Sequence, residues 1–83
     1  MTFQTEENRI YAKNEAGELI AEVTFPQTGE NTCTINHTFV DGSLRGQGIA
    51  DKLVQAAVNE ITSRGMEVQA TCSYAAAWLE KQH

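Results

Sequence analysis

Hydrophobic and polar residues alternate over several short stretches of this chain, and alternation with a period of two predicts β-strands. Residues 9–13 form one such stretch, and residues 19–25, rich in β-branched and aromatic side chains, form a second. Turn-forming residues, 14–18, separate the two, so we predict an antiparallel hairpin. The first seven residues are mostly polar, and we expect them to be frayed.

Residues 32–40 also alternate and predict a third strand, after a loop over residues 27–31 that Pro26 introduces. Unbroken alternation gives one face of this strand four residues: Cys33, Ile35, His37 and Phe39. Both faces mix polar and apolar side chains, so neither is expected to be plain core.

The clearest helix follows a glycine-rich turn over residues 41–48. Apolar residues recur at helical spacing across residues 49–61 and form a wide stripe. Arg64 and Gly65 then supply the cation and the left-handed glycine typical of helix C-termini. We therefore predict a helix over residues 48–64.

The end of the chain predicts one more strand and one more helix. Residues 66–71 alternate, and Ser73 is placed to cap a helix over the alanine-rich residues 75–81. A strand–helix–strand unit implies a right-handed crossover with the third and fourth strands parallel. We expect a single domain over residues 1–83 of the α+β class, with a mixed sheet of about four strands and two helices.

Charge and cysteine content narrow the classes of function. The net charge is −5, and the six Lys and Arg residues are dispersed, which disfavours binding to nucleic acid or to a membrane surface. No stretch is apolar enough to span a membrane, and no signal-peptide pattern opens the chain. The two cysteines are far apart, which predicts free thiols, no metal site and a cytoplasmic location.

The glycine-rich turn before the long helix is a candidate anion site. The first turn of a helix leaves N–H groups unpaired and carries partial positive charge, and glycines let a phosphate approach. The phosphate loop of nucleotide hydrolases would need a lysine and a hydroxyl after Gly48, where Ile49 and Ala50 stand. The dinucleotide fingerprint would need a glycine where Asp51 stands. Neither pattern fits.

A third pattern fits six consecutive residues: Arg45, Gly46, Gln47, Gly48, Ile49 and Ala50. They match Arg/Gln-x-x-Gly-x-Gly/Ala, the pyrophosphate loop of the GNAT superfamily of acetyl-coenzyme-A-dependent N-acetyltransferases. With His37-Thr38-Phe39-Val40 and Thr71-Cys72-Ser73-Tyr74, the stretch of residues 36–79 resembles a family of very small, stand-alone GNAT-like proteins.

The resemblance implies a minimal acyl-CoA N-acyltransferase (GNAT-like) fold and acetyl-CoA or coenzyme A as the cofactor. It implies that residues 45–50 bind the coenzyme A pyrophosphate, mainly through backbone N–H groups. It also implies that Phe39 and Val40 lie beside the pantetheine arm, which in the superfamily follows the end of this strand.

Acetyl transfer to an amine needs a base, an acid and a held carbonyl, and three residues are candidates. Cys72 ends the fourth strand, which should splay from the third, and could accept the acetyl group covalently; a buried structural thiol is the alternative. His37 is a candidate general base, or a hydrogen-bonded histidine of the sheet. Tyr74 lies roughly where larger relatives place the acid that protonates the leaving thiolate, or it is a packing aromatic. Cys33 is expected to fill the sheet.

Two functions of different class follow from the resemblance. One is a minimal N-acetyltransferase for an unknown amine acceptor, either a small molecule or a protein. The other is a coenzyme-A-binding module or partner subunit without its own turnover. Typical superfamily members carry helices between the first two strands and further strands at the end, which form much of the acceptor pocket. We expect a partner chain or a large exposed acceptor to complete the site.

Overall fold

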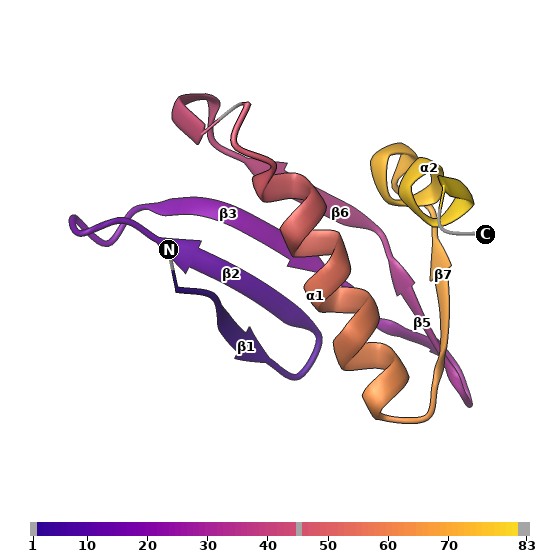
Figure 1. Ribbon diagram of the computed structural model, residues 1–83. Coiled ribbons are helices and arrows are strands. Elements are labelled where there is room, and N and C mark those ends of the chain that lie inside the picture. The colour runs from indigo at the N-terminus through magenta and orange to yellow at the C-terminus, as the bar shows by residue number, and fades with distance from the viewer. Residues whose placement is uncertain (1, 45, 82–83) are drawn as a thin grey trace.

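The computed structural model describes residues 2–44 and 46–81 (Figure 1). In chain order, the elements of this part of the chain are β1 (Gln4–Glu6), β2 (Arg9–Lys13), β3 (Leu19–Thr24), β4 (Gln27–Gly29), β5 (Thr32–Ile35), β6 (His37–Val40), the 3-10 helix η1 (Gly42–Leu44), α1 (Ile49–Ser63), β7 (Glu67–Ala70) and α2 (Ser73–Lys81). They form the predicted α+β class, with two α-helices, one antiparallel sheet and one mixed sheet.

An antiparallel sheet of four strands has the order β1-β2-β3-β6. Strands β2 and β3 are the predicted hairpin, which is confirmed. The Asn14 carboxamide oxygen accepts hydrogen bonds from the N–H groups of Ala16 (2.9 Å) and Glu18 (3.0 Å). Gly17 provides the positive φ of 82° that this turn requires.

The N-terminal segment differs from the prediction. Instead of fraying, residues 4–6 form β1, which pairs antiparallel with β2. The Arg9 guanidinium donates to the Glu6 carboxylate at 3.0 Å across this pair. The physical reason is that the outer edge of β2 offers unpaired backbone groups, which a preceding polar segment can satisfy without a hydrophobic side chain.

The predicted third strand, residues 32–40, is two strands in different sheets. β5 lies between β4 and β7 in a three-stranded sheet, whereas β6 lies beside β3 in the other sheet. Asn36 separates them, because its N–H donates to the Thr24 carbonyl (3.2 Å) and its side chain accepts from the Thr24 hydroxyl (2.6 Å). The loop predicted over residues 27–31 likewise contains a strand, β4, which pairs antiparallel with β5.

The break at Asn36 inverts the alternation of side chains. Cys33 and Ile35 are fully buried, but His37 and Phe39 are exposed. The predicted common face for these four residues is therefore wrong.

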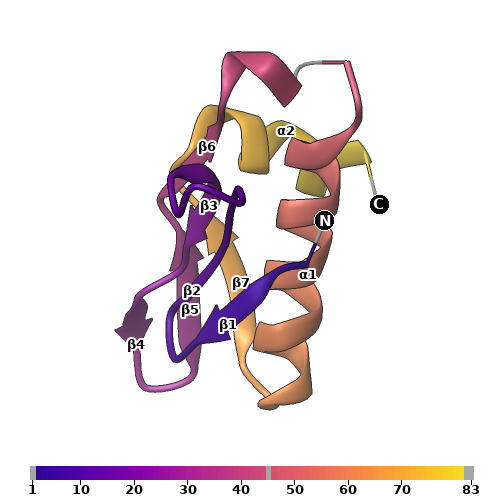
Figure 2. The same ribbon diagram turned by 90° about the vertical axis from the view of Figure 1, so that its left-hand side faces the viewer.

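The crossover through α1 is confirmed. β5 and β7 are parallel, and α1 runs from Ile49 to Ser63 between them in sequence, with Gly48 and Arg64 as its caps. Figure 2 shows α1 lying along one face of both sheets. Buried apolar residues fill the space between helices and sheets: Ile10, Ala12, Ala21, Val23, Phe25, Cys33, Ile35, Ile49, Leu53, Val54, Ala57, Ile61, Ala75 and Trp78.

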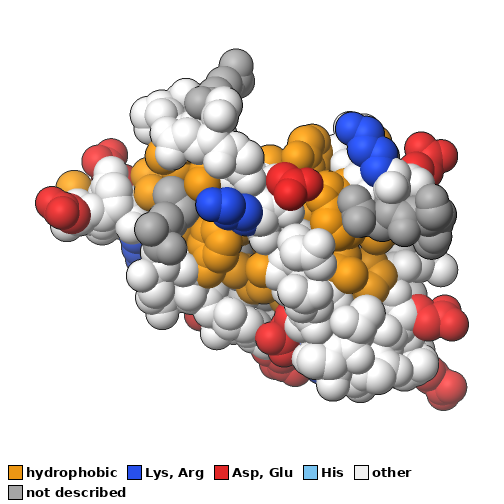
Figure 3. Space-filling view, viewed as in Figure 1, with side chains coloured by type: hydrophobic (Ala, Val, Ile, Leu, Met, Phe, Trp, Pro, Cys, Tyr) orange, Lys and Arg blue, Asp and Glu red, His pale blue; other side chains and the backbone are white. Residues whose placement is uncertain are grey.

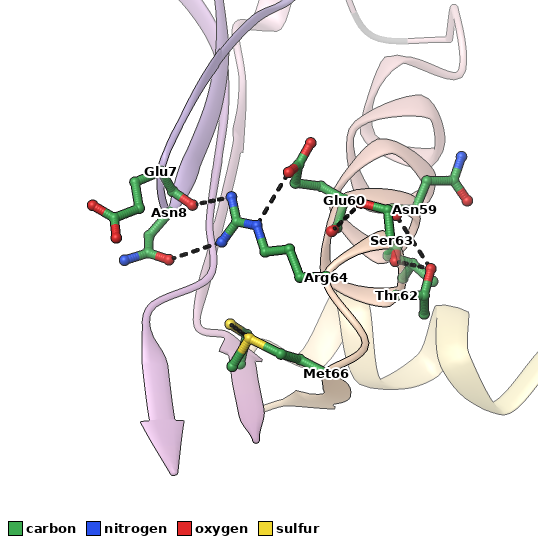
Figure 4. Close-up of polar contacts among 10 residues, drawn as sticks. Glu7, Asn8, Asn59, Glu60, Thr62, Ser63, Arg64 and Met66 are labelled. Atoms are coloured by element: carbon green, nitrogen blue, oxygen red, sulfur yellow. Dashed lines mark hydrogen bonds and ion pairs between the residues drawn. The ribbon is translucent and has the colours of Figure 1, made fainter. Parts of the chain in front are cut away.

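The C-terminal end of α1 is tied to the β1–β2 turn by Arg64 (Figure 4). The guanidinium donates to the Glu60 carboxylate (3.1 Å), to the Asn8 side-chain oxygen (3.5 Å) and to the Glu7 carbonyl. It also lies over the ring of Phe25, 5.6 Å from the ring centroid. These contacts hold the helix against the far end of the hairpin.

Candidate functional site

The two sheets separate where β6 and β7 diverge (Figure 1). β5 and β7 stay paired as far as Ile35 and Ala70. The N–H groups of Thr71 and Cys72 both donate to the Ile35 carbonyl, at 3.0 and 3.2 Å. Beyond this point β6 follows β3, while the chain after β7 enters α2. The predicted splay between the two strand ends is thus present, and it opens an edge of β6.

The loop before α1 needs glycine for its backbone conformation. Gly46 and Gly48 have φ of 83° and 70°, in the left-handed region. An added Cβ would meet no atom within 4 Å at either position, so crowding is not the reason for glycine. Earlier in the loop, hydrogen bonds from the Ser43 hydroxyl and N–H lower the pKa of Asp41 and fix the turn. Arg45, predicted to bind the cofactor, lies outside the described residues.

The N-terminus of α1 lacks a side-chain cap. Gly48 occupies the cap position without a side-chain hydrogen bond, and its carbonyl accepts the first helical hydrogen bond from Lys52 N–H at 3.1 Å. The N–H groups of residues 49–51 therefore have no partner within the helix, and the helix dipole adds partial positive charge there. This helix end can bind an anion through its backbone.

A pocket of about 270 Å³ lies at this helix end. Its lining residues come from the end of β6, the glycine loop and both helices: Val40, Leu44, Gly46, Gly48, Ile49, Ala50 and Tyr74. Five of the eight predicted cofactor residues are thus brought together. Gln47 is exposed and does not line the pocket. Phe39 also lies outside the lining: it projects from the face of β6 opposite to Val40, with 36% of its surface exposed.

Cys72 lies at the start of α2, where it faces β6. Ser73 was the predicted cap, but the Ala76 N–H donates to the Cys72 carbonyl at 2.9 Å, which makes Cys72 the capping residue. The Cys72 thiol is half-buried, and its sulfur lies 3.6 Å from the Thr38 hydroxyl oxygen. The side chain therefore bridges the gap between the diverging strands.

The surroundings of Cys72 favour its thiolate. Burial raises the pKa of this thiol, but hydrogen bonds lower it by more. They come from the Ala75 N–H group and the Thr38 hydroxyl, with a further contribution from the Tyr74 N–H group. The net pKa lies below the ordinary value for cysteine, as is typical of thiols at helix N-termini.

The other candidates are placed apart from this thiol, except Tyr74. Tyr74 is 45% exposed and lines the pocket two residues after Cys72. His37 lies on the opposite face of β6 from Thr38, with its Nε2 3.7 Å from the Glu22 carboxylate. Cys33 is fully buried in the sheet.

The sequence alone did not identify Thr38 as a contact of Cys72. Alternation over residues 32–40 places Thr38 on the face opposite to Cys33, but nothing in the sequence relates it to Cys72. The available signal was Asn36, a poor strand former in the middle of the stretch. Among the residues that the structure describes, no three His, Cys, Asp or Glu side chains are grouped to hold a metal ion. No helix in the described ranges is long and apolar enough to cross a membrane.

Comparison with known proteins identifies close relatives of this architecture. The sequence profile of the family described as GCN5-related N-acetyl-transferase matches residues 9–83. The solution structure of a GCN5-like protein from Staphylococcus aureus is 32% identical, with 98% of this chain and 79% of that chain covered at a TM-score of 0.79. The search of curated proteins finds no significant match.

Larger enzymes share only part of their length with this chain. The IAA acetyltransferase from Bacillus cereus is 26% identical with a TM-score of 0.69. The alignment covers 88% of this chain but 51% of the Bacillus cereus protein. This chain therefore spans about half the length of that enzyme.

Proposed function

The chain belongs to the GCN5-related N-acetyltransferase family, and we propose that it binds acetyl-coenzyme A and transfers the acetyl group to an amine. The observation that carries this proposal is the pocket at the N-terminus of α1, whose lining includes Tyr74, two residues after the Cys72 thiol at the N-terminus of α2. An anion site, a free strand edge and an activated nucleophile follow one another in the order of the parts of acetyl-coenzyme A.

The pyrophosphate would bind at the start of α1. The N–H groups of residues 49–51 point out of the helix end, and Gly46 and Gly48 keep side chains away from it. Hydrogen bonds from N–H groups to a charged oxygen are about twice as strong as those between neutral groups. The site can thus bind the two phosphates without a metal ion in its lining.

The pantetheine arm would follow the free edge of β6. Asp41 N–H donates to the Ile20 carbonyl at 2.8 Å, so the backbone groups of Val40 point away from β3 toward the opening. From Val40 to Thr38 the strand advances about 7 Å. An arm hydrogen-bonded along this edge would bring its thioester to Cys72, which contacts Thr38.

Cys72 is the proposed nucleophile. Its thiolate attacks the thioester carbonyl, the bond from the acetyl carbon to the coenzyme A sulfur breaks, and the coenzyme A thiolate leaves. Tyr74 lines the pocket and is the proposed donor of a proton to that thiolate. An amine then attacks the acetyl-cysteine, forming the amide and returning the Cys72 thiolate. The proton of the amine goes to solvent, and solvent returns a proton to Tyr74.

His37 receives no part in the first step. It is a candidate general base, but its side chain lies on the face of β6 opposite to Thr38, the residue that Cys72 contacts. The N–H groups of α2 and the Thr38 hydroxyl already favour the thiolate. A base that takes the proton of the amine would have to lie on the same face of β6 as Cys72, beside the gap between β6 and β7.

Two measurements test the proposal. Coenzyme A at 100 times its dissociation constant should raise the free energy of unfolding by about 2.7 kcal/mol in a thermal or chemical melt. Incubation with acetyl-coenzyme A should add one acetyl group, about 42 mass units, to Cys72. Cys72→Ala should abolish the adduct, and Cys33→Ala should leave it. Failure of coenzyme A to bind would exclude the proposed function.

The coenzyme-A-binding module is the second candidate. The five-residue turn between β2 and β3 contains no helix, whereas larger members carry part of their acceptor pocket there. Tight binding of coenzyme A, no adduct on Cys72 and no effect of Cys72→Ala on any amine acetylation would favour the module. A partner chain would then supply the acceptor site.

A further inference from the structure

The strands at the ends of the two sheets are β1, β6, β4 and β7, and they differ in how their outer edges are protected. The edge of β6 faces the gap toward β7. All residues of β1 and β4 are exposed and polar or glycine. β4 also has a register shift, and the Gln27 carboxamide donates to the Gly29 carbonyl at 2.9 Å. Short polar strands and irregular pairing keep sheet edges from binding other chains. β7 has neither a register shift nor a fully polar edge.

The outer edge of β7 is regular. Its residues, Glu67–Ala70, pair in parallel with β5 without a register shift. The N–H groups of Glu67 and Thr71 donate to carbonyl groups on the β5 side, at 2.7 and 3.0 Å. Backbone groups point alternately to the two sides of a strand, so those of Val68 and Ala70 point away from β5. They can form hydrogen bonds with one further strand.

Apolar side chains along this edge are only partly covered. Met66, Val68 and Ala70 pack against the core, yet each keeps part of its surface exposed. Their neighbours in β5, Cys33 and Ile35, are fully buried. A strand added beside β7 would remove this apolar surface from water, which favours its binding.

The charge near the start of β7 selects the kind of strand. Glu67 is exposed, and Glu30 is exposed next to Asn31, whose carbonyl accepts the Glu67 N–H. No Lys or Arg of residues 2–44 and 46–81 forms an ion pair with either glutamate. Figure 3 shows acidic side chains at the margin where Figure 1 places β5 and the start of β7. With a net charge of −5, the protein attracts a basic segment here and repels a second copy of itself.

The other end of β7 leads to the thiol. Cys72 follows Ala70 by two residues and is half-buried at the start of α2. A strand added to a sheet lies about 4.8 Å from its neighbour. The flexible four-carbon stem of a lysine can cross that spacing at the end of β7. A peptide on this edge can therefore carry an amine to Cys72.

We propose that the outer edge of β7 binds an extended basic peptide as an added strand, and that a lysine of this peptide accepts the acetyl group. The inference rests on the proposed function, because it takes the acetyl group to be held by Cys72. The neutral lysine amine forms a bond to the acetyl carbon, and the bond from that carbon to the Cys72 sulfur breaks. The thiolate returns, and the proton of the amine goes to solvent.

The first test is hydrogen exchange of single amides in the parent protein. The probe is a peptide of about eight residues made of valine, threonine and arginine with one lysine. It should slow exchange at Val68 and Ala70 at least about tenfold, because these N–H groups gain partners. Exchange at Gln69, whose N–H faces β5, should not change. The same peptide with glutamate in place of arginine is the control and should give no protection.

Two results of this test would overturn the proposal. One is equal protection of Val68, Gln69 and Ala70, which would indicate general stabilisation instead of an added strand. The other is protection of Val68 and Ala70 that grows with protein concentration in the absence of peptide. That result would assign the edge to a second copy of the chain.

The second test measures acetylation of the lysine in peptides that carry one backbone N-methyl group at each position in turn. A strand bound by its edge faces β7 at every other residue, so kcat/KM should fall at least about tenfold at alternate positions only. A uniform loss, or no loss at any position, would contradict strand addition.

Glu67→Lys tests the charge. It should lower kcat/KM for the basic peptide about fivefold, mainly through KM. Glu15→Lys makes the same change in net charge at an exposed position of the β2–β3 turn and should leave kcat/KM unchanged. An equal loss in both variants would overturn the placement of the peptide at β7.

Two measurements without peptide separate this inference from the proposed function: binding of coenzyme A and the acetyl adduct on Cys72. If both are positive but the peptide gives neither protection nor acetylation, the inference is wrong and the proposed function stands. If coenzyme A does not bind, the proposed function and the inference are both excluded.

Discussion

The C-terminal end of α1 is closed by its own chain, whereas the N-terminal end is left open. At the C-terminal end, Met66 N–H donates to the Ile61 carbonyl (3.2 Å) and Gly65 N–H to the Thr62 carbonyl (3.0 Å). This is the Schellman pattern, with Gly65 at a φ of 75°. At the other end, Gly48 is also left-handed but offers no side chain to the helix. Two glycines of similar conformation thus lie at opposite ends of the helix: one belongs to a hydrogen-bonded cap, and the other leaves the helix end uncapped.

The two ends differ in whether the backbone groups without a partner inside the helix are hydrogen-bonded by neighbouring residues. Arg64 adds side-chain contacts to the closed end and joins it to the β1–β2 turn. The open end keeps its N–H groups available beside a pocket. Substitutions at the closed end should therefore change stability, and substitutions at the open end should change affinity for coenzyme A.

The largest effect is expected from matched substitutions of the two glycines. Gly48→Asp places a carboxylate where we propose that the pyrophosphate binds, and affinity for coenzyme A should fall more than tenfold. Gly65→Asp makes the same change at a similar backbone conformation and should lower stability with little change in affinity. Calorimetry and chemical denaturation measure both quantities. Equal affinity in Gly48→Asp and the parent would contradict the phosphate site.

Arg64→Met should lower the free energy of unfolding by about 1 kcal/mol, because it removes hydrogen bonds to the β1–β2 turn at a partly exposed site. Glu60→Gln removes only the contact within the helix and should cost about 0.3 kcal/mol. Urea denaturation measures both. Coenzyme A should bind both variants as it binds the parent, and a large loss of affinity would show that the two ends are coupled.

Alkylation of Cys72 should depend on pH with a midpoint below that of an ordinary thiol. Its pKa is lowered, so the reactive thiolate forms as pH rises through this lower value. Thr38→Val removes the hydroxyl that contacts the sulfur and should raise the midpoint, slowing alkylation at pH 7 a few-fold. Iodoacetamide labelling read by mass spectrometry measures the rate. A midpoint unchanged by Thr38→Val would show that the Thr38 hydroxyl does not lower the pKa of Cys72. Cys33 is the control: it is buried and should stay unlabelled in the folded protein.

Of the two loop glycines, Gly46 should have the smaller effect on affinity for coenzyme A when it is substituted, as in Gly46→Ala. The left-handed φ of 83° is strained for alanine, but the added methyl group meets no described atom within 4 Å. The strain should cost about 1 kcal/mol, and affinity for coenzyme A should fall by about threefold or less. Gly17→Ala, with a φ of 82° in the hairpin turn, is the control for strain away from the site. Greater loss of affinity than in Gly48→Asp would reverse the assignment of the two loop glycines.

The elements that the sequence predicts correctly are those with local causes. Alternation over adjacent stretches and five turn residues specify the hairpin of β2 and β3. Apolar spacing and flanking glycines specify α1 to within one residue at each end. The same glycines indicate the loop of the pocket, since their positive φ is a local backbone requirement. The aligned N–H groups of the helix start follow from that loop.

Pairing between distant segments explains the two strand predictions that were wrong, the frayed N-terminus and the single strand over residues 32–40. The first seven residues carry no strong strand signal, but the free edge of β2 orders part of them as β1. Asn36 looks like one weak residue in a strand until Thr24, twelve residues earlier, binds its side chain. That contact divides the strand between two sheets and inverts its faces.

One contact of the candidate site depends on this division, because Thr38 meets Cys72 across 34 residues of sequence. The sequence by itself determined each helix, each glycine and the presence of a thiol after the last strand, because neighbours along the chain fix backbone conformation. Only the tertiary structure decided which side chains meet, because the break at Asn36 and the divergence of β6 from β7 arise from hydrogen bonds between distant segments.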